Sequence, residues 1–203
     1  MSKENFIEDL KNKENRDIFL DYLQGNNVWY FADFLKVDEP SVAYDNFKKF
    51  VSQSLDVNFN NISIVGSGKI GFSMAPEKGF KDFCPDHTDP KKISDIDLII
   101  VSSRFFHKFW EAYLDLFNEK VNFGYSYVSS TIFRKFVSIK NPKPIHPFFR
   151  EWITKIDKFN KDYQIMFGIK HEINYRIYES WEAVELYHLK GIQELKEKIT
   201  IIQ

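Results

Sequence analysis

The sequence predicts an α+β domain, with a small mixed β-sheet, helices packed on the sheet and a helical extension at the N-terminus. Three observations lead to this prediction. The first sixty residues have helical texture, short apolar runs of strand type follow in the middle, and the last twenty residues again have helical periodicity. We expect an N-terminal helical region over residues 1–60 and a compact domain over residues 61–203. The order of elements is also compatible with a mixed α/β domain.

Composition excludes several classes of protein. The chain has 203 residues, enough to bury a substantial core, and its formal net charge of −1 indicates neither a nucleic-acid nor a membrane partner. The polar N-terminus, MSKENFIEDLKNKEN, has no apolar stretch of signal-peptide type, and no apolar run approaches the ~18 residues of a membrane helix. We therefore expect a cytoplasmic protein. One cysteine, Cys84, excludes an internal disulfide and a zinc site built from several cysteines.

The first half of the chain is predicted to contain a helix, two strands and a loop. Residues 41–55 carry apolar side chains near helical spacing, and NISIV at 61–65 is a short apolar run that ends in a glycine-containing turn. Residues 75–93 hold Pro, Gly, Asp and Lys without periodicity, which predicts a loop. DIDLIIVS at 95–102 then predicts a buried strand.

The second half is predicted to be mainly helical. FFHKFWEAYLDLF at 105–117 predicts a helix with five aromatic residues on one face: Phe106, Phe109, Trp110, Tyr113 and Phe117. Residues 121–146 are ambiguous, and 148–159 predict a helix. QIMFGIKHEINYRIYES at 164–180 predicts one long strand or a hairpin, and residues 181–198 predict a closing helix.

Two aspartates at the start of the second strand are the first chemical signal. Side chains alternate faces along a strand, so Asp95 and Asp97 share a face while Ile96 points away. Two carboxylates roughly 6–7 Å apart between Cα atoms can converge on a divalent cation, and a bound Mg²⁺ would remove their mutual repulsion. The simpler interpretation is a strand entry with two solvated aspartates.

A glycine-serine turn upstream is the second signal. Gly66, Ser67 and Gly68 follow the first strand and are expected to open a helix. Glycine lets the backbone approach a phosphate closely, and free N–H groups at a helix start favour an anion. The Ser67 hydroxyl adds a donor, and Lys69 adds charge unless it is an ordinary surface lysine.

Strand, Gly-Ser, helix and an Asp-x-Asp pair on the next strand together resemble the nucleotidyltransferase superfamily, which has the DNA polymerase beta-like fold. The resemblance covers residues 61–102 and includes Ser94 in a Ser-Asp-x-Asp form. It implies that Gly66 and Ser67 hold a nucleoside triphosphate and that Asp95 and Asp97 bind catalytic Mg²⁺, with two ions expected. It also implies an inserted loop of roughly fifteen residues between the two motifs, because family members space them more closely.

The family has a third carboxylate on a later strand, for which Glu172 is the candidate here. Glu172 would be a metal ligand or the base that deprotonates an acceptor hydroxyl, and Arg176 would pair with a phosphate or a carboxylate. An ion pair between Glu172 and Arg176 on a solvated surface is the alternative. Asp157 and Asp162 are fallback candidates on or after the predicted helix.

Two further stretches have both a functional and a simpler structural interpretation. CPDHTDP at 84–90 could ligate a metal, but its spacing matches no zinc pattern and indicates a polar loop. The segment from Arg134 to Lys161 is locally basic and would suit RNA or a triphosphate, although a solvated helix face explains it equally well.

The resemblance implies transfer of a nucleoside monophosphate from a triphosphate to a protein, RNA or nucleotide hydroxyl. Small members of the superfamily often work in prokaryotic toxin–antitoxin or antiphage defence systems, which implies a partner toxin or effector. The alternatives are a nucleotidyltransferase-like binding protein without turnover, and an interaction domain in which the match is accidental.

Overall fold

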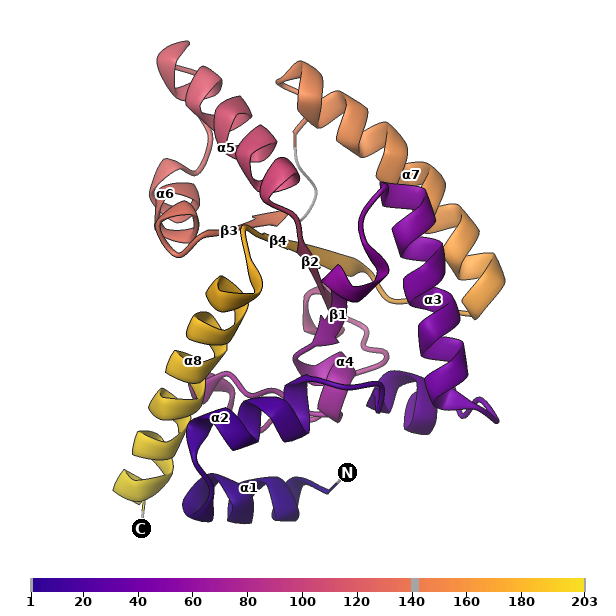
Figure 1. Cartoon of the computed structure of the whole chain (residues 1–203), viewed down its shortest axis with the longest axis vertical. Coiled ribbons are helices and arrows are strands. Elements are labelled where there is room, and N and C mark those ends of the chain that lie inside the picture. The colour runs from indigo at the N-terminus through magenta and orange to yellow at the C-terminus, as the bar shows by residue number, and fades with distance from the viewer. Residues whose placement is uncertain (1, 140–142, 203) are drawn as a thin grey trace. The chain divides into compact units, whose positions relative to one another are not determined.

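The computed structural model describes residues 2–139 and 143–202, which contain helices and a four-stranded sheet (Figure 1). The α-helices are α1 (Lys3–Asn12), α2 (Asn15–Ile18), α3 (Pro40–Leu55), α4 (Ser67–Ile70), α5 (Ser103–Asn118), α6 (Tyr125–Phe133), α7 (Pro147–Phe167) and α8 (Trp181–Ile202). Short 3₁₀ or π segments are η1 (Phe19–Leu23), η2 (Tyr30–Phe34), η3 (Phe59–Asn61), η4 (Pro76–Lys78) and η5 (Pro90–Lys92). Within this described part, no helix is both long and apolar enough to span a membrane.

The sheet has the strand order β1-β2-β4-β3, from β1 (Ile62–Val65), β2 (Ile96–Val101), β4 (Ile173–Tyr178) and β3 (Phe136–Ile139). β3 and β4 are antiparallel, with Phe136 opposite Tyr178 and Ile139 opposite Tyr175. All four residues of β1 and five of the six in β2 are buried, so their apolar runs are core strands. The prediction of an α+β chain with a small mixed sheet and packed helices is confirmed.

The chain divides into two compact units. Unit 1 comprises Met1–Asn46, Ile64–Asp97 and Val184–Gln203, and unit 2 comprises Phe47–Ser63 and Leu98–Ala183. The division falls inside α3, β1, β2 and α8, so each unit is assembled from separated segments of sequence. Helices from the first sixty residues occur in both units.

Unit 1 joins the N-terminal helices to the end of α8 through packing and polar contacts. Ser2 caps α1 by accepting a hydrogen bond from the Asn5 amide at 3.1 Å. Phe6 of α1 is fully buried and meets the ring of Phe72 at 5.3 Å between centroids. At the other end of the sequence, Gln193 accepts a hydrogen bond from the Asn15 side chain at 2.9 Å.

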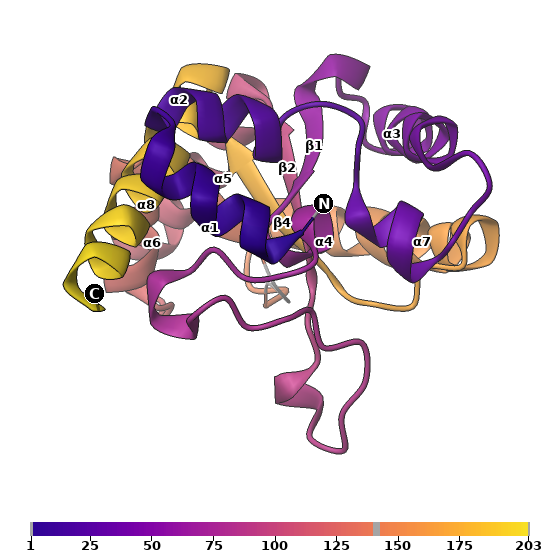
Figure 2. The ribbon, with the colours of Figure 1, turned by 90° about the horizontal axis from the view of Figure 1, so that it is seen from below.

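The segment between α4 and β2 is the predicted loop, and it extends as a long open excursion of the chain (Figure 2). It holds only the short segments η4 and η5 and one isolated bridge between Phe72 and Asp82 among the residues described. Near the end of the loop, the Cys84 amide donates a hydrogen bond to the Ser94 hydroxyl at 2.9 Å. The loop therefore connects the glycine-serine turn to the Asp95–Asp97 pair.

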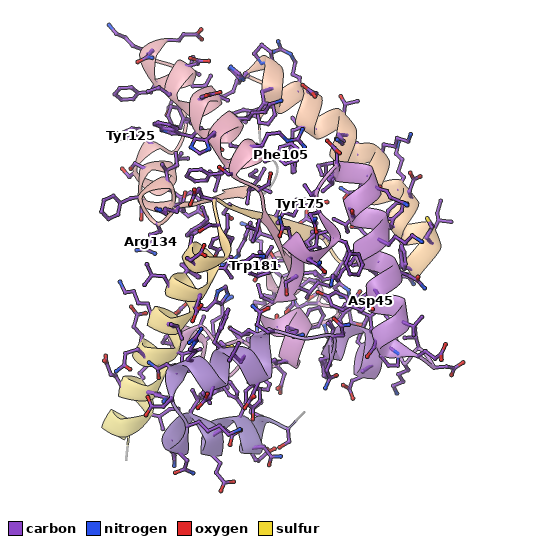
Figure 3. The ribbon with its side chains drawn as sticks, in the orientation of Figure 1. Asp45, Phe105, Tyr125, Arg134, Tyr175 and Trp181 are labelled. Carbon is purple, nitrogen blue, oxygen red and sulfur yellow. The ribbon has the colours of Figure 1, made fainter. Side chains whose placement is uncertain are left out.

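In unit 2, α5 forms where it was predicted. Ser102 caps the helix by accepting a hydrogen bond from the Phe105 amide, and Phe105, Phe106, Phe109, Ala112 and Leu116 are its buried residues. The predicted aromatic face is only partly buried, because Phe106 and Phe109 are in the core while Trp110 is 42% exposed and Phe117 is 52% exposed. Figure 3 shows Phe105 of α5 in the interior and Tyr125 of α6 at the periphery.

The prediction of one long strand or a hairpin over residues 164–180 is wrong. Residues 164–167 are the last turn of α7, and Gly168 ends that helix at φ 66°, with its amide donating to the Gln164 carbonyl at 3.1 Å. β4 begins only at Ile173. The ambiguous stretch 121–146 contains α6 and β3, while Lys140, Asn141 and Pro142 lie outside the described residues.

Three tyrosines of unit 2 are held in the protonated form by their surroundings. Burial raises the pKa of Tyr113, of Tyr163 and, most strongly, of Tyr175. The Tyr175 ring packs edge-on against Trp152 at 5.7 Å, and its hydroxyl donates to the Asn160 side chain at 3.1 Å. Ionising this hydroxyl inside the core would place an anion in apolar surroundings.

We therefore expect unit 2 to lose stability as the pH rises above about 10, the pKa of tyrosine in an unfolded chain. The pKa is higher in the folded state, so the stabilisation is fully present below pH 10 and is lost as the pH climbs toward the folded values. Tyrosinate absorbance and far-ultraviolet circular dichroism should be followed together. Tyr175→Phe should remove part of the late absorbance. Ionisation of all ten tyrosines before any loss of helix signal would contradict the expectation.

Candidate active site

The glycine-serine turn and the second aspartate lie in direct contact in unit 1. A Cβ atom added to Gly66 would lie 2.9 Å from Oδ2 of Asp97, closer than real Cβ contacts allow. Gly66 follows β1 directly, and Asp97 is the second residue of β2. The structure therefore brings together two motifs that thirty residues of sequence separate, as the sequence interpretation requires.

Glycine is needed at position 66 for a second reason. Gly66 has φ 67° and ψ −149°, a backbone conformation that essentially only glycine adopts. This conformation turns the chain out of the buried strand and starts α4 at Ser67. Both the backbone angle and the space beside Asp97 thus require a residue without a side chain.

The predicted helix after the turn is a single turn of four residues. The Lys69 amide donates to the Gly66 carbonyl at 3.0 Å, and the Gly71 amide donates to the Ser67 carbonyl at 2.9 Å. Gly71 then ends the helix in the left-handed conformation at φ 90°. So short a helix has little macrodipole, and anion binding here would depend on the local N–H groups and the Ser67 hydroxyl.

The two aspartates flank a fully buried isoleucine, as the alternation predicts. Asp95 directly precedes β2, Ile96 is 0% exposed, and Asp97 is half-buried like Asp95. Gly68 lies over the same strands, because a Cβ there would be 3.5 Å from the Ile64 side chain and 3.8 Å from that of Ile96. The turn thus packs closely on the two strands that carry the site.

Two residues of the N-terminal region support this arrangement and were not identified from the sequence. Tyr44 of α3 is buried, and its hydroxyl accepts a hydrogen bond from the Ile64 amide of β1 at 2.9 Å. Trp29 lies against Gly71, where a Cβ would come 2.9 Å from the indole. Gly71 was the signal in the sequence that another residue packs closely here, but the sequence does not show that this residue is Trp29.

Lys69 is not the surface lysine that was the simpler interpretation. Its side chain is 1% exposed, and its Nζ donates to the Gly25 carbonyl at 2.7 Å.

Glu172 and Arg176 lie in unit 2, so their predicted roles beside Asp95 and Asp97 stay predictions. Glu172 precedes β4 and is exposed, whereas the strand itself begins at Ile173. Arg176 is half-buried on the face opposite the buried Ile173 and Tyr175, as predicted. The fallback residues Asp157 and Asp162 lie on α7 in the same unit.

Across residues 2–139 and 143–202, no group of three or more His, Cys, Asp or Glu side chains is arranged to hold a metal ion. This includes the Cys84–Pro90 stretch, where Cys84 Sγ approaches the Asp86 carbonyl and His87 accepts from the Asp89 amide at 2.9 Å. Those contacts are typical of polar turns. A pair of carboxylates still suits Mg²⁺, which proteins commonly bind through one or two carboxylates together with substrate phosphates.

The basic segment from Arg134 to Lys161 has structural partners at several positions. Lys135 lies 3.7 Å from Glu179, and Arg150 donates to the Pro144 carbonyl at 3.2 Å. Lys140 of this segment lies outside the described residues. These contacts favour the interpretation as an ordinary solvated surface.

Comparison with known proteins returned no matching family model, no matching curated protein and no matching solved structure.

Proposed function

We propose that the chain is a Mg²⁺-dependent nucleotidyltransferase that transfers a nucleoside monophosphate from a nucleoside triphosphate to a hydroxyl group. The observation that carries the proposal is the contact of Gly66 with Asp97. At this place in unit 1, the turn at Gly66 has no side chain and would let phosphate approach the backbone. The Asp97 carboxylate beside it would bind a divalent cation.

Each residue of the turn and the pair has a role that its surroundings support. Backbone N–H groups at Ser67 and Gly68, with the Ser67 hydroxyl, would bind the triphosphate oxygens. Asp95 and Asp97 would hold Mg²⁺, which when bound neutralises phosphate charge and polarises the phosphorus under attack. Their half-burial limits the water that competes for these contacts.

The proposed transfer breaks one bond and forms one. The acceptor oxygen bonds to the α-phosphorus, the bond from that phosphorus to the bridging oxygen of the β-phosphate breaks, and pyrophosphate leaves. The acceptor proton goes to water. A protein side chain, an RNA 3′ end and a second nucleotide all offer a suitable hydroxyl. We also propose that the chain acts in a toxin–antitoxin or antiphage defence system.

The test is turnover of labelled ATP, GTP, CTP and UTP with Mg²⁺, followed as pyrophosphate release and as label on protein, RNA or nucleotide. We expect Asp95→Asn and Asp97→Asn each to lower turnover by about 100-fold or more, because each removes a ligand of the Mg²⁺ that would stabilise the transition state. Chelation of Mg²⁺ should have the same effect. Asp86→Asn, an exposed aspartate of the loop, is the matched control and should retain turnover. Equal activity in all four proteins would contradict the proposal.

A second candidate is a nucleotide-binding protein of the same kind without turnover. The observation that favours it is that no group of three or more His, Cys, Asp or Glu side chains in residues 2–139 and 143–202 is arranged to hold a metal ion. Thermal unfolding with and without Mg²⁺–triphosphate separates the candidates. Stabilisation that Asp97→Asn removes, without pyrophosphate release for any nucleotide and acceptor, would favour this binding role.

A further inference from the structure

Lys69 is a buried lysine whose ammonium group is held by the backbone. Its side chain is 1% exposed, its Nζ donates to the Gly25 carbonyl at 2.7 Å, and Nζ lies 6.0 Å from the centroid of the Tyr44 ring. Burying an ammonium group is costly unless hydrogen bonds compensate for the lost water. The hydrogen bond to the Gly25 carbonyl compensates for part of this cost.

Helix geometry argues against a phosphate contact for Lys69. Successive residues in an α-helix are about 100° apart, so Lys69 and Ser67 point to nearly opposite sides of α4. The Ser67 hydroxyl is one of the proposed phosphate donors. A side chain on the other side of the turn, already bonded to the Gly25 carbonyl, is poorly directed to join it.

The short helix needs outside support that Lys69 is placed to give. An isolated helix of four residues is unstable, because nucleation costs more than one or two hydrogen bonds return. Two contacts with residues 25–29 hold its far end: the Gly25 carbonyl accepts from Lys69, and Trp29 packs against Gly71. At its near end, Gly66 lies against Asp97. The turn is therefore fixed between the acidic strand and the N-terminal segment.

We infer that Lys69 is a positioning residue, which holds the Gly66–Ser67 turn beside Asp97 through its hydrogen bond to the Gly25 carbonyl. The structural part of this inference concerns the protein without ligand. Its consequence for nucleotide binding rests on the proposed function.

Amide hydrogen exchange of the ligand-free protein tests the structural part. Lys69→Met keeps the length of the side chain and removes the donor, so the amides of Lys69, Ile70 and Gly71 should exchange about tenfold faster or more. Lys69→Arg retains a donor and should restore slow exchange. Lys196→Met is the matched control, because Lys196 also donates to a backbone carbonyl in unit 1, that of Lys13, away from the turn. Unchanged exchange in folded Lys69→Met would overturn the inference.

Kinetics of the full chain tests the consequence. A displaced turn weakens ground-state and transition-state binding of the triphosphate alike, so Lys69→Met should raise KM about tenfold and change kcat little. Asp97→Asn should instead lower kcat. Lys69→Arg should recover KM, which a general loss of folding would not allow. A fall in kcat at unchanged KM would contradict a positioning role.

The two tests separate the inference from the proposed function. Faster exchange in Lys69→Met, with no nucleotide turnover by the wild-type chain, would leave the positioning role standing and remove the enzyme proposal. Nucleotide turnover by the wild-type chain, with unchanged exchange in Lys69→Met, would support the enzyme proposal and overturn the positioning role. If Lys69→Met does not fold, Lys69→Leu, a shorter apolar side chain that also lacks the donor, should give the same faster exchange and higher KM. Wild-type values in that variant would overturn the inference.

Discussion

Replacing Gly66 by alanine is expected to remove nucleotide-dependent stabilisation and to destabilise unit 1. Two physical effects combine at this position. The backbone at φ 67° and ψ −149° is strained for any residue with a Cβ, by about 1–3 kcal/mol. The new methyl group would also lie 2.9 Å from Oδ2 of Asp97, so the carboxylate or the turn must move. Either movement separates the two halves of the candidate site.

Two matched glycine substitutions distinguish these effects. Gly79→Ala also introduces a side chain at positive φ, 54°, but a Cβ there meets no atom within 4 Å. Gly68→Ala adds a methyl group beside the same turn at ordinary contact distance from Ile64. Chemical denaturation measures the stability of each variant, and thermal shift with Mg²⁺–triphosphate measures ligand binding. Normal nucleotide stabilisation in Gly66→Ala would show that the close contact is irrelevant to binding.

Replacing Trp152 by alanine is expected to lower the free energy of unfolding by about 3–5 kcal/mol, the usual range for a large aromatic residue in a core. Trp152 of α7 is 3% exposed. Its ring packs edge-on against Phe109 at 5.0 Å and against Phe105 at 5.8 Å. With the Tyr175 contact described above, the indole joins α5, α7 and β4 in unit 2, and its removal leaves a large cavity.

Trp110→Ala is the control for this prediction. Trp110 lies on α5 and is 42% exposed, so its removal should change the free energy of unfolding by about 0.5 kcal/mol or less. Denaturant unfolding followed by circular dichroism gives both values. Similar losses in the two variants would mean that the buried face of α5 has been assigned wrongly.

The local motifs could be predicted from sequence because they depend on short-range rules. Strand alternation places Asp95 and Asp97 on one side of the buried Ile96, and a glycine after a short apolar strand predicts a turn. The adjacency of Gly66 and Asp97 required one further step, the resemblance to a family in which the two motifs meet. Local rules and that resemblance together predicted that the Gly66 turn and Asp97 lie side by side.

How much of the aromatic face of α5 is buried could not be predicted, because helical spacing does not show how far a face is covered. Phe109 is buried and Trp110 is 42% exposed, although both are large and apolar. The error over residues 164–180 has a different origin. Residues 164–167 continue α7, Gly168 ends that helix in the left-handed conformation, and β4 begins only at Ile173.

The burial of Lys69 was beyond sequence reasoning for a different reason. Lysine is rarely buried, so a lysine after a glycine-serine turn is read as a surface or phosphate-binding group. Its actual acceptor is a main-chain carbonyl 44 residues earlier, which no side-chain pattern reveals. Tertiary hydrogen bonds from side chains to distant backbone leave almost no trace in a single sequence.

The support given by Tyr44 to β1 has a consequence for how this protein can change over evolution. Tyr44 precedes the motif by some twenty residues, yet its hydroxyl satisfies a main-chain amide of the strand that leads into Gly66. Recombination with a breakpoint between positions 46 and 61 would transfer the Gly66 turn and the Asp95–Asp97 pair without the Tyr44 hydroxyl that supports β1. Variants that keep the conformation of β1 and the Gly66 turn should therefore retain α3 together with residues 61–102.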